Sequence, residues 1–141
     1  MSIEENKALV RRFLEEMNKK NLAVVDELYA ANFVGHLAGM EDVRGPEGLK
    51  QLVTGFLTAF PDLHRVIEDL VAEGDKVVAR LTVTGTHKGD FQGIAPTGKQ
   101  ATVTVIVIFR IVGGKIVETW ELIDMLGVMQ QIGAIPTPGQ G

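Results

Sequence analysis

Lys115-Ile-Val-Glu-Thr-Trp-Glu-Leu-Ile-Asp124 is the part of the sequence on which the architecture of this chain depends. The segment is strand-like, is apolar enough to belong to a core, and ends in a carboxylate. Val112-Gly113-Gly114-Lys115 directly before it has the form of a two-residue hairpin turn, which requires the positive φ angles that glycine adopts easily. We therefore expect an antiparallel hairpin with the preceding strand, Gln100 to Ile111.

Pairing through this turn predicts which side chains share a face. If Val112 lies opposite Lys115 and pairing continues in step, Val103 lies opposite Asp124. Because side chains alternate along a strand, one face is then apolar except at its ends. Its members are Phe109, Val107, Val105, Val103, Trp120, Leu122 and Asp124. The other face is mixed and suits an oligomer interface. It carries Thr102, Thr104, Ile106, Ile108, Arg110, Thr119, Glu121 and Ile123.

Asp124 is the first candidate for chemistry. A carboxylate beside Val103 and Leu122 is partly desolvated, which raises its pKa and suits it to general acid/base catalysis near neutral pH. The alternative is that Asp124 caps a helical turn over residues 125–130. A one-residue bulge in the hairpin would move Asp124 to the other face and remove the argument.

The rest of the chain predicts helices first and strands afterwards. Helices are expected over residues 2–17, where Ser2 and Glu5 have capping-box spacing, over 22–29, and from Gly45-Pro46 to Phe60. A short extended segment, residues 33–37, separates the last two of these helices. Strands follow at 64–72 and 76–85, then a Gly-rich loop at 86–99, the hairpin, and a helical turn at 127–132. This order predicts one α+β domain over residues 1–141, a curved antiparallel sheet with helices on one face, and a flexible tail at 135–141.

Composition excludes several classes of function. The net charge of −4 argues against nucleic acid or an anionic membrane as the main partner. The absence of cysteine removes disulfides, thiolate nucleophiles and cysteine-based metal sites. The N-terminus carries no apolar signal segment and no apolar run is long enough to cross a bilayer, so a cytoplasmic protein is expected.

Several segments spread over nearly the whole chain form a recognisable set. They are Phe33-Val-Gly-His36, Phe60-Pro-Asp-Leu-His64, Gly85-Thr-His-Lys-Gly-Asp-Phe-Gln-Gly-Ile-Ala-Pro-Thr-Gly-Lys99, Gly114-Lys-Ile-Val-Glu-Thr-Trp120, Asp124 and Gln130-Gln-Ile-Gly133. On these segments the chain resembles the SnoaL-like polyketide cyclases of the NTF2-like superfamily.

The resemblance implies an α+β-barrel, a cone of strongly curved sheet around helices with an apolar pocket. It implies ring closure of a polyketide ester by intramolecular aldol condensation without metal or cofactor. An aspartate is the acid/base in this family, and Asp124 is the matching position. The chain departs from many relatives at Val107, where they carry a polar or acidic residue, and at Thr119, where they carry histidine. Val107 makes the expected pocket more apolar than in those relatives.

Further candidates are the histidines and their neighbours. His36 is expected at the pocket mouth, as a catalytic partner of Asp124 or as a satisfied half-buried histidine. Asp62 and His64 share a face if extended, which indicates a second polar cluster or an exposed strand entry. His87 is expected at the pocket rim. The three histidines lie on separate elements without metal-ligand spacing, so no metal site is expected.

Aromatic and apolar residues complete the expected substrate site. Trp120 and Phe91 are candidate walls for a flat substrate, with core packing as the alternative for Phe91. Val107 and Leu122 belong to the same predicted face. Asp69 and Arg80 are expected to form a structural ion pair across the first hairpin.

Three functions compete at this stage. The first is a cofactor-free enzyme acting on a small apolar or aromatic carbonyl compound. The second is a non-catalytic binding or dimerisation module. The third is an epoxide hydrolase or an isomerase, although Arg110 falls on the wrong face for the Asp-Arg-Asp arrangement that epoxide hydrolysis requires in this superfamily, leaving Arg80. Ile106, Ile108 and Ile123 on the outer face predict a homodimer or higher homo-oligomer.

Overall fold

The structure, a computed structural model, describes residues 2–136, which form one six-stranded sheet and four helices. The helices are α1 (Ile3–Asn18), α2 (Ala23–Leu28), α3 (Gly45–Ala59) and α4 (Met125–Gln131). The strands are β1 (Tyr29–Leu37), β2 (Val43–Arg44), β3 (His64–Glu73), β4 (Lys76–Thr86), β5 (Gln100–Val112) and β6 (Lys115–Ile123). The predicted α+β class is confirmed. Of the tail predicted at 135–141, residues 137–141 lie outside the described residues.

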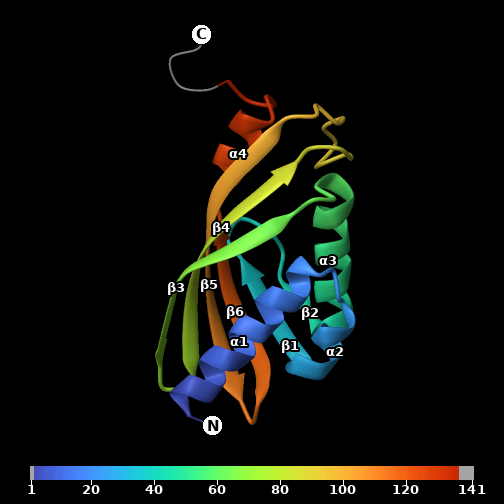
Figure 1. The fold of residues 1–141 in the computed structure, drawn as a ribbon. Coiled ribbons are helices and arrows are strands. Elements are labelled where there is room, and N and C mark those ends of the chain that lie inside the picture. The colour runs from blue at the N-terminus through green and yellow to red at the C-terminus, as the bar shows by residue number, and fades with distance from the viewer. Residues whose placement is uncertain (1, 137–141) are drawn as a thin grey trace.

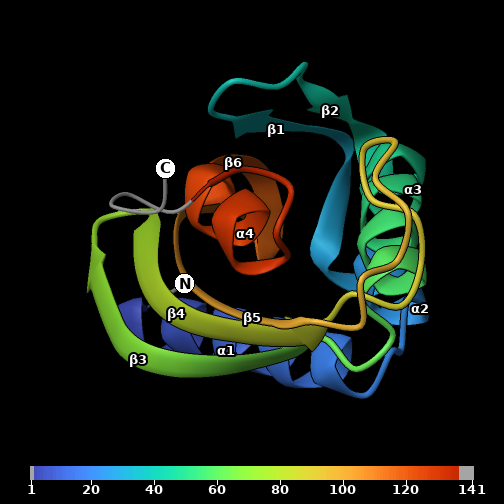
Figure 2. The same cartoon turned by 90° about the horizontal axis from the view of Figure 1, so that it is seen from above.

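The sheet is strongly curved and has the strand order β2-β1-β6-β5-β4-β3. Seen from above, the sheet and α3 close a ring, and α4 lies within its near opening (Figure 2). Helix α1 crosses β3 and β4, while α3 packs on β1 and β2 (Figure 1). The prediction of a purely antiparallel sheet is wrong for one pair, because β1 runs parallel to β6. Parallel pairing needs a long crossover, and α3 with the β3–β5 strands supplies it.

The N-terminal helix forms as its sequence predicts. The Ser2 side chain accepts a hydrogen bond from the Glu5 N–H, and the Glu5 carboxylate accepts one from the Ser2 N–H, each at 3.1 Å. At the other end, the Asn18 side-chain amide bonds both the N–H and the carbonyl of Arg65, at 2.9 Å each. Helix α1 is thereby attached to the first residues of β3.

A bulge in β6 sets the register of the hairpin. Val112 pairs with Lys115 and Ile111 with Ile116, as predicted. Arg110 then pairs with Glu118, so Val117 is an extra residue and every later pair is shifted by one position. The predicted pairs beyond this point are wrong for that reason.

The shift exchanges the two faces of β6. The inner face carries Val105, Val107 and Phe109 from β5, as predicted, but Thr119, Glu121 and Ile123 from β6. Trp120 and Leu122 lie on the outer face, beside Ile106 and Ile108. Glu121, expected outside, therefore points into the cone.

The interior has two packed regions. The larger one joins α1, α2 and the sheet and includes Phe13, Phe33, Phe109 and Ile116. The smaller one lies at the α4 end and contains Phe60, Phe91, Val128 and Ile132 with their neighbours. Residues of both regions line the main cavity, which therefore lies between them.

Ile116 tests this arrangement, because its side chain is fully buried beside the bulge, whereas Ile3 is 42% exposed on α1. Ile116→Ala is expected to lower the free energy of unfolding by about 2 to 5 kcal/mol, because it leaves a cavity in the core. The matched control, Ile3→Ala, is expected to change it by less than about 0.5 kcal/mol. Urea unfolding followed by circular dichroism measures both, and equal effects would contradict the burial of Ile116 in the core.

Candidate active site

The main cavity lies under α4 and is almost entirely apolar. It has a volume of about 90 Å³. Its walls come from β3, β4, β5, the end of β6, α3 and α4. Among the described residues that line it, Arg65 alone carries a charge. Arg65 was not among the candidates that the sequence suggested.

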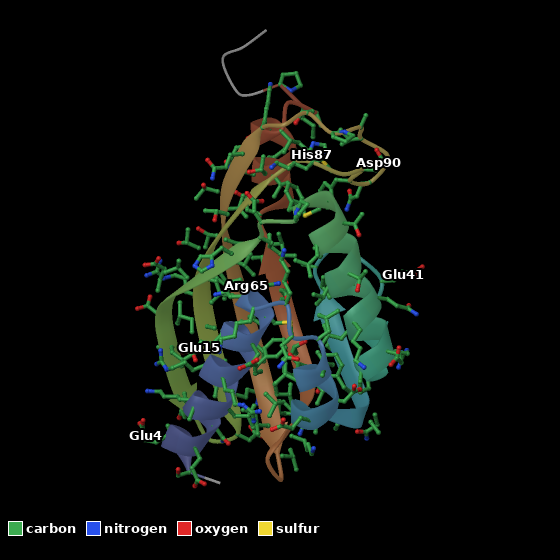
Figure 3. All side chains as sticks on the ribbon, turned by 45° about the vertical axis from the view of Figure 1, so that its right-hand side comes forward. Glu4, Glu15, Glu41, Arg65, His87 and Asp90 are labelled. Carbon is green, nitrogen blue, oxygen red and sulfur yellow. The ribbon has the colours of Figure 1, made fainter. Side chains whose placement is uncertain are left out.

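Arg65 lies on the inner face of β3, where the Asn18 amide holds its backbone. Figure 3 shows it near the middle of the molecule, beside the C-terminal end of α1. Burial lowers the pKa of its guanidinium, and the negative charge of Glu121 opposes that effect. Its Nη1 is buried and has no hydrogen-bond partner within residues 2–136. A buried guanidinium nitrogen in this state is a site for an oxygen of a bound molecule.

Glu121 provides the interior carboxyl group. It projects inward from β6, opposite Val107 on β5 and beside Leu37 on β1. Burial raises the pKa of the Glu121 carboxyl, and the positive charge of Arg65 partly offsets this. Over the described part of the chain, Glu121 and Arg65 share neither a hydrogen bond nor an ion pair within 4.0 Å. The two groups attract each other but keep hydrogen-bonding capacity for a ligand.

Tyr29 is the third polar group of this interior. Its ring packs edge-on against Phe13 and Phe33, with centroid distances of 5.0 and 4.7 Å. Burial and the nearby Glu121 raise the pKa of its hydroxyl well above the usual value, so the phenol stays neutral. Buried Tyr29 and half-buried Arg65 and Glu121 thus form an inward-facing group containing a neutral donor, a cation and a carboxyl; we call it the interior triad.

Asp124 lies outside this group. It is exposed, and its carboxylate accepts a hydrogen bond of 2.9 Å from the Gly127 N–H as the N-cap of α4. The alternative prediction of a helix cap is confirmed, and its predicted place on the inner face is wrong because of the bulge. Its neighbours Ile123 and Met125 line the cavity, so Asp124 lies near its rim. Its catalytic role stays a prediction.

His36 faces away from the cavity, and its predicted place at the pocket mouth is wrong. Its Nε2 lies 2.7 Å from Glu118 and its Nδ1 3.0 Å from Asp42, on the outer side of the sheet. The ring also stacks on Trp120 at a centroid distance of 5.7 Å. Glu118 first, and then Asp42, raise the pKa of His36. Trp120 belongs to this outer cluster, so it forms no wall of the cavity.

The remaining candidates divide between structural and lining positions. Asp62 accepts hydrogen bonds from the Thr86 N–H and hydroxyl, each at 2.7 Å, which lower its pKa and join β3 to β4. His64 is exposed at the start of β3. His87 is fully buried; its Nδ1 accepts a hydrogen bond of 3.2 Å from the Thr97 N–H. The predicted rim position of His87 is therefore wrong.

Phe91, Val107 and Leu122 occupy three different environments. Phe91 lines the cavity, as predicted. Val107 lies on the inner face but is packed in the larger core region. Leu122 is 59% exposed on the outer face, so its predicted place beside the substrate is wrong.

The structure also bears on the alternative functions. Asp69 and Arg80 pair at 2.6 Å on the surface, as predicted, so Arg80 does not serve the cavity. Arg110 lies on the outer face, as predicted, near Glu118 at 3.5 Å. Within residues 2–136 no group of three or more histidine, aspartate or glutamate side chains could hold a metal ion. None of the described helices is long and apolar enough to cross a membrane.

Sequence analysis missed the interior triad, although two signals pointed to it. Shifting the hairpin by one residue brings Arg110 opposite Glu118, a better pair than Phe109 with Glu118. That same shift turns Glu121 inward. The second signal is Arg65 itself. It occupies an inward-facing position of β3, whose other inward residues, Ile67 and Leu70, are apolar.

Residues 8–132 match the model of the family described as SnoaL-like polyketide cyclase. The chain belongs to this family. This SnoaL-like chain is similar to the aklanonic acid methyl ester cyclase DnrD of Streptomyces peucetius, with 33% identity over 134 residues that cover 92% of each chain.

Solved structures agree with this assignment. One similar structure is AclR from Streptomyces galilaeus, a proposed hydroxylase, with a TM-score of 0.87 and 32% identity over 96% of this chain and 85% of that one. Another is a proposed SnoaL-like polyketide cyclase from Jannaschia, with a TM-score of 0.88 and 28% identity over 96% and 97%. The chain therefore has the SnoaL-like, NTF2-like fold, which hosts more than one proposed activity.

The outer cluster of this SnoaL-like protein predicts a pH dependence. The pKa of folded His36 lies above its ordinary value of about 6.5. Its contribution to stability is therefore complete below about pH 6.5 and is lost as pH rises through the folded pKa. NMR titration of the His36 ring is expected to show this elevated pKa.

Glu118→Gln is expected to move the His36 pKa toward its ordinary value, because the Glu118 carboxylate is the larger cause. Glu41→Gln, which alters an exposed carboxylate beside Asp42, is the matched control and is expected to leave the titration nearly unchanged. An unaltered His36 pKa in Glu118→Gln would refute the proposed cause.

Proposed function

We propose that this protein catalyses a cofactor-free intramolecular aldol cyclisation of a polyketide ester. The observation that carries the proposal is that Glu121, a half-buried carboxyl of raised pKa, projects into the same cone as Arg65, the charged residue that lines the apolar cavity. A raised pKa makes a carboxylate a stronger base than an ordinary one and therefore favours a role in proton transfer. Membership of the SnoaL-like family and the similarity to aklanonic acid methyl ester cyclases support the class of substrate.

The interior triad can serve each step of this reaction. The Glu121 carboxylate removes a proton from the carbon next to a substrate carbonyl, and the resulting enolate oxygen pairs with the Arg65 guanidinium. The enolate carbon attacks a second carbonyl carbon of the same molecule, so one C–C bond forms. The new alkoxide then takes the proton back from Glu121. Charge in the cavity is balanced throughout, since the enolate replaces the carboxylate as the partner of Arg65.

Asp124 provides the competing assignment. It matches the family's acid/base position and lies between two residues that line the cavity. Its solvent exposure and its hydrogen bond to Gly127 favour a cap over a base. The two carboxylates must therefore be compared directly.

The comparison uses Glu121→Gln and Asp124→Asn, with aklanonic acid methyl ester as the probe substrate. Glu121→Gln is expected to reduce kcat at least about 100-fold, because it removes the proton acceptor. Asp124→Asn is expected to keep kcat within about threefold and to lower thermal stability, since a helix cap is worth about 1 kcal/mol. The reverse pattern would assign the acid/base role to Asp124.

The product identifies the type of reaction. An aldol cyclisation changes neither mass nor oxygen content, whereas a hydroxylation of the kind proposed for AclR adds an oxygen atom. Mass spectrometry of the product under air and under nitrogen therefore distinguishes the two. Ligand binding without turnover, unaffected by either substitution, would favour a non-catalytic binding module.

We also propose that the protein self-associates through the outer face of the sheet. Val66, Ile106 and Leu122 are 45%, 40% and 59% exposed on that face. Burying the exposed apolar surface of these side chains stabilises an interface by about 25 cal/mol for each Å² removed from water. A second copy of this small curved sheet is the simplest partner.

Sedimentation velocity tests this. The native protein is expected to sediment as a dimer or larger species, and the double variant Ile106→Glu, Leu122→Glu as a monomer. The control Val112→Glu changes a residue that is 50% exposed at the hairpin turn and is expected to leave the assembly intact. A native protein that is monomeric at all concentrations would refute the proposal.

A further inference from the structure

The main cavity is too small for the proposed substrate. Its volume is about 90 Å³, whereas an apolar protein cavity known to hold benzene measures about 150 Å³. A polyketide ester with several rings therefore needs more space than the interior offers. Additional space lies on the other side of one wall of this cavity.

A groove of about 340 Å³ lies against this wall on the surface of α3. Its lining comes from α3, from the segment after β1 and from the loop between β4 and β5. Its residues are Met40, Gln51, Leu52, Gly55, Asp90 and Gln92, together with Phe56 and Phe91. We call it the α3 groove. Figure 3 shows Asp90 on the loop beside the end of α3.

Phe56 and Phe91 line both spaces, so their rings form the partition between them. The ring centroids lie 5.9 Å apart with a tilt of 39°. Phe91 also packs edge-on against Phe60 at 5.2 Å, deeper in the cavity. Phe56 is only half-buried, whereas Phe91 is 6% exposed.

The backbone around Phe91 is fixed. Phe91 and Ile94 exchange two hydrogen bonds of 3.0 and 2.9 Å across a turn in which Gln92 and Gly93 have positive φ. The N–H groups of Lys88 and Gly89 both bond the Ala59 carbonyl at the end of α3. With Phe91 held in this way, rotation of the Phe56 side chain is the simplest movement that joins the groove to the cavity.

We propose that the α3 groove is a second substrate subsite, and that Phe56 is the gate between it and the cavity. The inference rests on the proposed function for the class of ligand. The reacting carbonyl groups lie inside, near Arg65, while the distal hydroxylated aromatic part of the molecule occupies the groove. Met40 and Leu52 contact its faces, and the oxygens of Gln51, Asp90 and Gln92 accept hydrogen bonds from its hydroxyl groups.

Gly55 gives direct access to this subsite. A Cβ atom built at Gly55 meets no protein atom within 4 Å, although the residue lines the groove. A larger side chain there fills the groove without disturbing the fold, and it removes a glycine from a helix interior, which stabilises α3. Thr54, the preceding residue, is exposed but does not line the groove. It offers a matched control position.

The experiment titrates the full chain with 1,8-dihydroxyanthraquinone by isothermal calorimetry. Gly55→Leu is expected to weaken binding at least about tenfold, which corresponds to about 1.4 kcal/mol of lost contact. Gly55→Ala is expected to have a smaller effect, and Thr54→Leu none. In stopped-flow measurements with aklanonic acid methyl ester, whose reacting end must pass the gate, Phe56→Ala is expected to raise the association rate constant. Circular dichroism verifies that each variant is folded.

Equal affinity for Gly55→Leu and the native protein would overturn the subsite, as would the absence of anthraquinone binding to the native protein. An unchanged association rate in Phe56→Ala would overturn the gate. Failure of the proposed function would give a different set of results from failure of the subsite. Binding that depends on Gly55 without turnover of aklanonic acid methyl ester removes the cyclase but keeps the subsite. Normal turnover and KM in Gly55→Leu removes the subsite but keeps the cyclase.

Discussion

The extra residue in β6, Val117, determines what the interior of this protein contains. Side chains in a strand alternate, so one inserted residue turns every later side chain to the opposite face. Without it, Asp124 and Trp120 would point inward and Glu121 would point to solvent. With it, the cone receives a carboxyl group near Arg65, and the sheet places an aromatic ring outside. The identity of the β6 side chains that face the interior follows from this single irregularity.

The two charged groups inside the cone, Arg65 and Glu121, are destabilising, and the structure around them holds them in place. Removing a carboxylate and a guanidinium from water costs several kcal/mol each, which an imperfect pair does not fully recover. The Asn18 amide fixes the backbone of Arg65, and the packed regions on either side of the cavity hold the walls in place. A buried pair without mutual hydrogen bonds is typical of a functional site, where stability is given up for binding or catalysis.

Much of the fold could be predicted from local sequence. The Ser2–Glu5 capping box, the Gly113–Gly114 turn and the alternation of Val103 to Phe109 each act over a few residues, and each appears in the structure. The site could be predicted only in part, because it depends on how distant strands meet. The signal for the bulge, Arg110 opposite Glu118, appears only when the pairing of two strands is considered, and the coupling of Arg65 with Glu121 joins strands that are not neighbours in the sheet. Family resemblance identified the architecture, and its assignment of the acid/base role to Asp124 stays a prediction.

The parallel pairing of β1 with β6 has a consequence for how the protein is made. Strand β1 leaves the ribosome early, but its main neighbour in the sheet is completed only at Ile123, near the end of synthesis. Until then, β1 lacks its neighbour on one side, and folding must close a very long loop at a late stage. Completion of the sheet is therefore a late event that depends on β6.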